Sequence, residues 1–426
     1  MKIFEYLMKS LEGVRLSVKV LVIFFLSSIL SFLIIACDEF LPSAPEPNEI
    51  LNEPIEGLSP SQLAAHLEGD EQFGKIFNTE DGLGPIFVNT SCENCHIADG
   101  KGHPFIQLTR FGKMNLDGTF DPMTEYGGPQ LQQRSISGYP PEEIYSEATG
   151  RSVFMPPAVT GLGLIEAVSD ATILALADPD DLNGNGISGV PNYVDPPDYF
   201  QSKPGFHIPN NGKYIGRFGR KAGAITILQQ VAQAYQQDVG ITSDFLPEDL
   251  YNHTLGSGTG DKIPDPELSA SVIKSVEFYI KTLKPPPRRN QNDADVIGGE
   301  NIFKQINFSG CHVPKLISGP SEIEALNQKE FYPYTDMLLH DLGPELDDYY
   351  TEGTAKTGEW RTIPLWGLGL GKNSQGGKSF FLHDGRAKTI QEAINFHGGE
   401  ASQTKSNYNN LSDSDKQKLL KFLESL

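Results

Sequence analysis

Two cysteines and a histidine, arranged as Cys92-Glu93-Asn94-Cys95-His96, form the stretch of this chain with the most specific chemistry. The C-x-x-C-H pattern is the covalent attachment site of a c-type haem. Its thiols add to the porphyrin vinyl groups, and the adjacent imidazole becomes the proximal ligand of the iron. A redox or zinc C-x-x-C that happens to precede a histidine is the alternative, but a zinc site needs further thiolate or imidazole ligands. Because the chain has only four cysteines, the pattern favours haem.

An incomplete copy of this pattern occurs in the second half of the chain. Residues 300–303 precede Cys311-His312 by the same number of positions as residues 84–87 precede Cys95-His96. Phe308 then occupies the place of the first cysteine. One thioether and the His312 imidazole can still hold a haem c. A chance Cys-His pair without a cofactor is the alternative, and the matched flank favours a second haem.

Apolar residues at helical spacing close each of the two units. The first closing helix is expected over 267–283, with Asp265 as N-cap and Pro266 in the first turn. The C-terminal helix is expected to start at Ser412, where Asp415 completes a capping box. Each unit therefore runs from a haem motif to an amphipathic helix. This plan predicts a mainly α fold of two cytochrome c-like domains in tandem, the first with a long insertion.

The N-terminal segment is typical of an exported protein. Residues 1–36 are expected to be a lipoprotein signal peptide, because basic residues precede an apolar run that ends at Cys37, as in a bacterial lipobox. A transmembrane anchor is the alternative. Residues 37–58 then form a flexible tether, followed by haem domains at 59–284 and 290–426. The protein is expected at the cell envelope, lipid-anchored on the periplasmic side or at the cell surface, where c-type haem is attached.

Charge and one polar loop bear on further ligands. The formal net charge of −21 argues against a nucleic-acid ligand and favours either solubility or docking to basic partners. In the insertion of the first unit, Asp181, Asn183 and Asn185 place oxygen ligands at alternate positions before Gly186, as a calcium loop requires. A solvated Asn/Gly turn is an equal alternative.

Several further segments complete a recognisable pattern over roughly residues 60–426. They are 161–167, 214–222, 333–341, 359–367, 382–387 and 393–401. Together with the two haem motifs, these segments resemble the bacterial di-haem oxidoreductase family, whose members are described as peroxidases or labelled thiol oxidoreductases. Distant relatives of that family are the di-haem cytochrome c peroxidases.

Two departures from the family pattern fall in the second unit. The family usually has a complete C-x-x-C-H where this chain has Phe308, and it usually reads His-Asp-Met-Gly where this chain has His340-Asp341-Leu342-Gly343. If that methionine ligates iron in relatives, the ligand here is different or absent. The chemistry of the second haem is therefore what these changes affect.

The resemblance implies one haem that relays electrons and one with a position open to peroxide. His96 and His312 are the expected proximal ligands. His383 is the first choice for a distal ligand and His340 the second. Met155, before two prolines, is either a distal ligand or a core side chain.

Acid–base and propionate-binding groups are expected in the same segments. Glu166 is a lone carboxylate in an apolar segment and a candidate to move protons during O–O cleavage, or else a helix-start carboxylate bonded to backbone amides. Arg361 and Arg386 are candidates to pair with haem propionates, and Arg361 belongs to the expected catalytic site. Trp360 and Trp366 flank Arg361, either as an electron relay or, more simply, as core packing.

The resemblance thus implies a di-haem c-type cytochrome that reduces hydrogen peroxide or a similar acceptor. Its donor would be a small cytochrome, a cupredoxin or a quinol-linked protein of the periplasm. The rival hypothesis is a non-enzymatic electron carrier of the envelope with both irons six-coordinate. A thiol oxidoreductase is a weaker hypothesis, because the thiols near the motifs are the haem anchors themselves.

Overall fold

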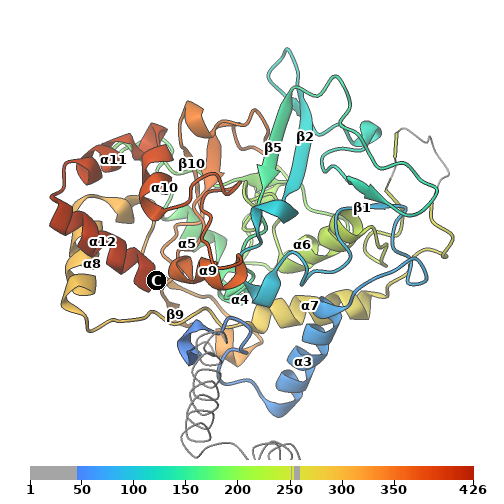
Figure 1. Ribbon diagram of the computed structural model, residues 1–426, viewed down its shortest axis with the longest axis horizontal. Helices are drawn as coiled ribbons and strands as arrows, with labels where there is room; N and C mark the ends of the chain where they lie inside the picture. The colour runs from blue at the N-terminus through green and yellow to red at the C-terminus, as the bar shows by residue number, and fades with distance from the viewer. Residues whose placement is uncertain (1–45, 251, 254–259) are drawn as a thin grey trace, which may run out of the picture. The chain divides into compact units, whose positions relative to one another are not determined.

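A computed structural model describes residues 46–426 except 251 and 254–259 (Figure 1). The expected signal peptide and the lipidation site Cys37 lie outside these residues. Residues 48–426 form one compact unit. No helix within the described ranges is both long and apolar enough to cross a bilayer.

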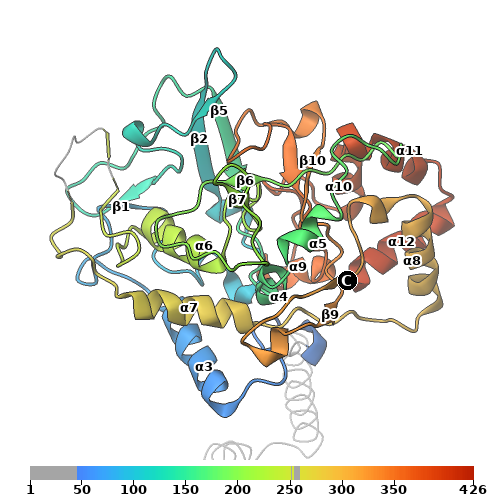
Figure 2. The same ribbon diagram turned by 180° about the vertical axis from the view of Figure 1, so that it is seen from behind.

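Helices occur along the whole described chain, and most of them are short. Their bounds are α3 (Pro60–Gly74), α4 (Leu162–Glu166), α5 (Asp170–Leu174), α6 (Ile227–Ala234), α7 (Ala270–Thr282), α8 (Ala294–Gln305), α9 (Gly371–Ser374), α10 (Ile390–Phe396), α11 (Ser402–Asn409) and α12 (Asp413–Ser425). The two most extensive helix–helix contacts are between α3 and α7 and between α8 and α12, and Figures 1 and 2 show each pair side by side.

Each of these two helix pairs crosses at a glycine. A Cβ atom on Gly69 of α3 would lie 2.7 Å from Cβ of Tyr279 on α7, and a Cβ atom on Gly299 of α8 would lie 2.6 Å from Cβ of Phe422 on α12. Because a glycine has no side chain, each helix backbone approaches its partner closely enough to bury an aromatic residue. The same contact thus occurs once in each half of the chain.

Strands are short, and all of them pair antiparallel. Their bounds are β1 (Ile86–Phe87), β2 (Leu108–Met114), β3 (Phe120–Asp121), β4 (Arg134–Ser135), β5 (Gly150–Phe154), β6 (Tyr193–Val194), β7 (Tyr214–Ile215), β8 (Leu316–Ile317), β9 (Glu330–Phe331), β10 (Leu339–Asp341) and β11 (Glu359–Arg361). Within the described residues, β3, β2 and β5 form a three-stranded sheet, and the other strands pair two by two. Two of these ladders matter for the site, because β5 leads into Met155 and β11 carries Trp360 and Arg361.

The expected fold class is wrong. Helices make up only about a third of the structure and strands add to it, so the chain is not a mainly α tandem of cytochrome c-like domains. The physical reason is the 43 glycines and 30 prolines, which interrupt helices and favour turns. Long irregular segments therefore connect the helices, most of all between residues 75 and 226.

The closing helices are confirmed, although one begins later than expected. Ser412 caps α12 and accepts the amide of Asp415. In contrast, α7 begins at Ala270, after Ser269. Asp265 does not cap this helix, because its side chain accepts a hydrogen bond from the Thr242 hydroxyl. The expected repeat around the motifs also differs in structure, since residues 86–87 form strand β1 and residues 300–303 belong to helix α8.

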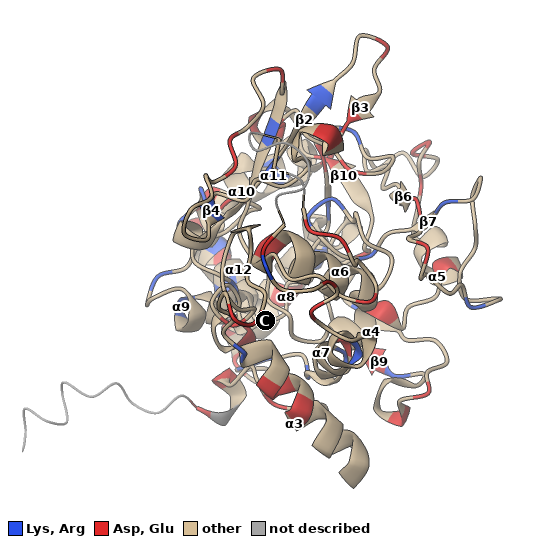
Figure 3. Ribbon diagram, turned by 90° about the vertical axis from the view of Figure 1, so that its right-hand side faces the viewer, with Lys and Arg blue, Asp and Glu red and all other residues tan. Residues whose placement is uncertain are grey.

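The two halves of the chain are joined by more than their linker. One large hydrophobic core contains Leu164 and Val276 from the first half together with Leu326, Leu338 and Trp366 from the second. A smaller core lies between α8 and α12. Acidic residues, in contrast, occur on many surface loops and along α3 (Figure 3).

Candidate functional site

The first cavity contains the complete cysteine–histidine motif. It has a volume of about 620 Å³, and Cys92, Cys95 and His96 line it. The backbone N–H groups of Cys95 and His96 both donate to the carbonyl oxygen of Cys92, at 3.0 and 2.9 Å. This single turn therefore brings two thiols and an imidazole to one wall. Both thiols are free, and burial raises the pKa of Cys92 to about 12 and that of Cys95 to about 11.

The imidazole of His96 is held in the orientation that an iron ligand requires. Its Nδ1 lies 2.7 Å from the carbonyl oxygen of Pro157, so Nδ1 carries the proton and Nε2 is left as an acceptor. Burial lowers the pKa of His96 to about 4, although the bond to Pro157 opposes this shift. The ring is therefore neutral at physiological pH, which is the form that binds iron.

Met155 lines the same cavity as His96. Its side chain is almost completely buried, and its Sδ accepts the Nε2–H of Gln375 at 3.3 Å. The structure thus brings Met155 to the first haem motif, and its role as a distal ligand stays a prediction.

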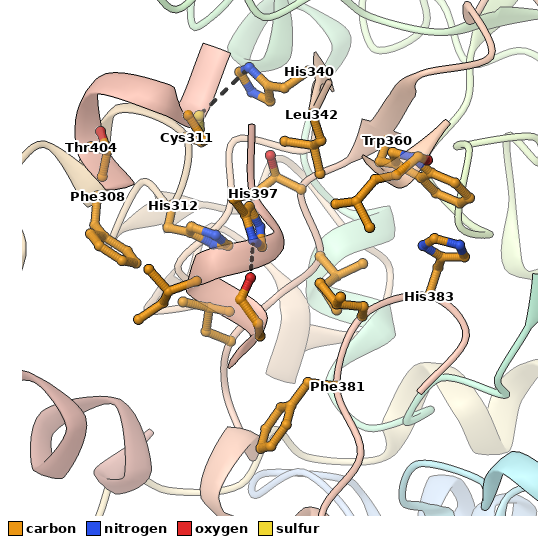
Figure 4. A pocket seen from close by; sticks show the side chains of 18 of the residues that line it. Phe308, Cys311, His312, His340, Leu342, Trp360, Phe381, His383, His397 and Thr404 are labelled. Carbon is orange, nitrogen blue, oxygen red and sulfur yellow. Dashed lines mark hydrogen bonds between the residues drawn. The ribbon is translucent and has the colours of Figure 1, made fainter. Parts of the chain in front are cut away.

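The second cavity contains the incomplete motif. It has a volume of about 180 Å³, and Phe308, Cys311 and His312 line it (Figure 4). The Nδ1 of His312 lies 3.1 Å from the carbonyl oxygen of Tyr334, as His96 does with Pro157. Burial again lowers the pKa of this histidine to about 4. The two proximal candidates therefore share one arrangement, and Leu342 also lines the second cavity.

His340 lines the second cavity, but both of its ring nitrogens have partners. Nε2 lies 2.8 Å from Asp336 Oδ2, and Nδ1 lies 2.7 Å from Glu400 Oε2. Burial opposes protonation, yet the hydrogen bonds to Asp336, Cys311 and Glu400 raise the pKa of His340 well above its usual value. A protonated imidazole with two carboxylate partners has no lone pair to offer iron.

His383 lies elsewhere on the wall of the second cavity (Figure 4). Its ring stacks on Trp360 with centroids 3.8 Å apart and an interplanar angle of 14°. Its Nε2 lies 2.8 Å from Asp348 Oδ2. Burial lowers the pKa of His383, although Asp348 raises it in part. At neutral pH the ring is therefore neutral, with Nε2–H donating to the Asp348 carboxylate and Nδ1 left as an acceptor.

His397 is the remaining histidine of this wall. Its Nδ1 lies 2.7 Å from the carbonyl oxygen of Ala393, which leaves Nε2 as an acceptor. The ring lies near His312 in Figure 4 and lowers the pKa of that residue. Trp360, in turn, donates its indole N–H to Leu346 and has the ammonium of Lys221 3.7 Å from its ring centroid.

Three cationic side chains line both cavities. They are Lys101, Arg220 and Arg361. Arg361 was expected from the sequence to pair with propionates, whereas the positions of Lys101 and Arg220 were not expected. Lys101 follows the first haem motif and Arg220 lies in segment 214–222, but only the tertiary structure brings them together.

Two residues expected at the haem sites, Glu166 and Arg386, line neither cavity. Glu166 accepts the amide of Ile227 at 2.7 Å, at the start of α6, and forms an ion pair with Lys281 at 2.7 Å. Glu166 is therefore a carboxylate bonded to the backbone at the start of a helix, which is the second of the two roles expected from the sequence. Arg386 forms ion pairs with Asp384 and Asp348 at 2.6 and 3.5 Å.

The loop with the calcium pattern is exposed and satisfies its oxygens locally. The Asp181 carboxylate accepts the amide of Gly186 at 3.1 Å, and Asn185 accepts the amide of Ile187 at 2.8 Å. Asn183 donates to Asp178. Calcium at this loop stays a prediction.

Most of the chain is similar to a known protein family. The family model described as "Di-haem oxidoreductase, putative peroxidase" matches residues 46–114 and 145–426, a range that includes both cysteine–histidine motifs. A search of curated proteins gives no match. Among solved structures, a chain of hydrazine synthase from Kuenenia stuttgartiensis, pressurised with 20 bar xenon, is similar at 13% identity and a TM-score of 0.35, over 91% of this chain and 96% of that chain.

Proposed function

Because the chain belongs to the di-haem oxidoreductase family, we propose that it is a c-type cytochrome that reduces hydrogen peroxide, or a similar small acceptor. A donor protein of the cell envelope would supply the electrons. One observation carries this proposal. Each cavity has an imidazole, His96 or His312, whose Nδ1 is fixed on a backbone carbonyl beside at least one thiol. This arrangement suits two haems held by sulfur and nitrogen.

The residues that line the two cavities define how each haem would be held. Cys92, Cys95 and His96 would hold the first, and Cys311 and His312 the second. Bound haem supplies an iron that accepts and passes single electrons. Reduction of one peroxide to two waters consumes two electrons and two protons, so the protein has to deliver protons as well as electrons.

His383 is the group best placed to move a proton in the second cavity. Because its Nε2–H is fixed on Asp348, Nδ1 can accept a proton from one peroxide oxygen and return it to the other. Transfer to the leaving oxygen lets it depart as water when the O–O bond breaks. Trp360 keeps the imidazole plane fixed by stacking, whereas Glu166 lines neither cavity and is paired with Lys281.

A comparison of two variants tests the assignment. In holoprotein supplied with a reduced small cytochrome, His383→Gln should lower peroxide turnover by about 10²–10⁴-fold. Glu166→Gln is the matched control, because Glu166 lines neither cavity, and this variant should keep its turnover. Equal losses in both variants would contradict the role of His383.

Spectra of the resting proteins separate the alternatives. EPR of the wild type should show a high-spin iron in some oxidation state, since peroxide needs an open position. If both irons are six-coordinate and low-spin in every state and peroxide is not consumed, the protein is an electron carrier and the proposal fails. If His383→Gln converts a low-spin signal to high-spin, His383 is an iron ligand rather than a proton carrier.

We also propose that the protein resides at the cell envelope, lipid-anchored through Cys37. Support comes from the basic and apolar segment that precedes Cys37 and from the need to attach c-type haem outside the cytoplasm. Cell fractionation tests this part of the proposal. Cys37→Ala should move the haem-containing protein from the membrane fraction to the soluble fraction, and unchanged membrane association would contradict lipidation.

A further inference from the structure

Three cationic side chains lie where the two cavities adjoin. The inference drawn from them rests on the proposed function. Lys101, Arg220 and Arg361 each line both cavities. Arg220 and Arg361 are 5% and 8% exposed, so their charges are largely removed from water. Burial and the neighbouring charge of Arg220 lower the pKa of Lys101 to about 8 and that of Arg361 to about 10. The three groups are thus close enough to repel one another.

Backbone and side-chain hydrogen bonds hold these cations together against their repulsion. The amide of Arg361 donates to the carbonyl oxygen of Arg220 at 3.1 Å, and the Arg361 Nε–H donates to the carbonyl oxygen of Gly219 at 2.9 Å. The Lys101 segment is fixed in turn by α9, because the Ser374 hydroxyl donates to the Lys101 carbonyl oxygen at 2.8 Å. The arrangement therefore belongs to the fold and does not depend on flexible surface side chains.

The acidic residues around the three cations already have other partners. Asp384 and Asp336 raise the pKa of Arg220 and Arg361 in part, but Asp384 pairs with Arg386 at 2.6 Å and Asp336 with His340 at 2.8 Å. Within the described part of the chain, none of the three cations forms an ion pair with a carboxylate, and Arg220 Nε has no hydrogen-bond partner. Buried charges normally have a counter-ion. We therefore expect a bound ligand to supply the anions that neutralise these three cations.

We propose that Lys101, Arg220 and Arg361 form a single anion-binding seat that takes propionate carboxylates from both haems. A haem carries two propionates, and guanidinium groups bind carboxylates through paired N–H donors. The seat joins the two cofactors electrostatically, because each of its charges faces both cavities. Each cation favours the reduced, less positive state of both irons.

A redox titration of the holoprotein tests the shared seat. Lys101→Gln is the main variant, because Lys101 is half-buried and its ammonium contacts the Phe381 ring face at 5.6 Å rather than a carboxylate. This substitution should lower the midpoint potentials of both haems. Arg361→Gln is a second variant in which the same two shifts are expected, so the test does not depend on one protein remaining folded.

Two controls assign each potential to its cavity. Arg110 lines only the first cavity and Lys405 only the second. Arg110→Gln should therefore lower one potential and Lys405→Gln the other. If Lys101→Gln and Arg361→Gln each shift one potential only, or neither, the shared seat is wrong even where peroxide is turned over. If the wild type binds no haem by pyridine haemochrome, the proposed function itself fails.

Discussion

At the residue scale, Phe308 distinguishes the second cysteine–histidine motif from the first. Its ring lines the second cavity beside Cys311 and packs on Phe303 with centroids 5.4 Å apart. An aromatic ring thus stands where a second sulfur would attach. A haem at this site would keep one vinyl group unreacted, since Cys311 can form only one thioether.

This difference gives a prediction that can be read from the haem itself. Phe308→Cys should complete the motif and shift the α band of the pyridine haemochrome to shorter wavelength, because one fewer vinyl group remains conjugated with the ring. Phe308→Ser removes the same ring without supplying a thiol and should leave the band unchanged. An unshifted band in Phe308→Cys, with the new thiol free to alkylate, would contradict the single-thioether site.

At the element scale, a glycine decides how closely each pair of long helices packs. In α8, Gly299→Ala should lower the free energy of unfolding by about 1–3 kcal/mol, because the new Cβ would lie 2.1 Å from the Lys418 carbonyl oxygen. The neighbouring Gly298 provides a matched control. A Cβ there would meet only the flexible end of the Lys418 side chain at 3.2 Å, so Gly298→Ala should leave stability equal or higher. Denaturant unfolding measures both, and equal effects would contradict the close crossing.

The elements also show how far sequence patterns could predict this structure. Residues 270–282 and 413–425 are strongly periodic, and both were expected as helices. Local patterns could not show that Asp265 would bond to Thr242, because that contact joins residues distant in sequence. Nor could they place Lys101 beside Arg220 and Arg361. The cysteine–histidine motifs were predictable because their spacing alone encodes chemistry, whereas a cavity wall depends on tertiary packing.

Strand β10 carries a charged network whose stabilising effect depends on pH. Burial opposes ionisation of Glu400, but His340 lowers its pKa to about 2, while the pKa of His340 is raised. The carboxylate therefore stabilises the fold above its unfolded pKa near 4.5 and loses this effect as the pH falls toward 2. Protonated His340 stabilises the fold fully below its unfolded pKa of about 6.5. This stabilisation is lost as the pH rises through the pKa of His340 in the folded protein.

His340→Gln should accordingly cost about 3 kcal/mol near pH 5.5, because it leaves Asp336 buried without a cationic partner. Unfolding in denaturant across pH 2.5–8 measures this cost. The difference from wild type should shrink at both ends of the range. Exposed Glu345→Gln serves as a control with little expected effect, and a constant difference down to pH 2.5 would contradict the coupling.

At the scale of the whole molecule, the second cavity is built from both halves of the chain. Cys311 and His312 come from the second half, whereas Lys101, Ile187 and Arg220 come from the first. Residues 290–426 expressed alone should therefore fail to retain haem at Cys311, as measured by intact mass and haemochrome. Full-length protein cut within the linker 284–289 after folding should keep both haems. Stoichiometric haem on the isolated half would contradict this interdependence.

The three cations at the boundary of the cavities also constrain how the protein matures. Without porphyrin carboxylates, closing the molecule would bring like charges together out of water, and this repulsion penalises the closed state. A haem-free chain would therefore be less stable than the holoprotein and more readily attacked by proteases. Its cellular abundance should consequently follow the haem supply.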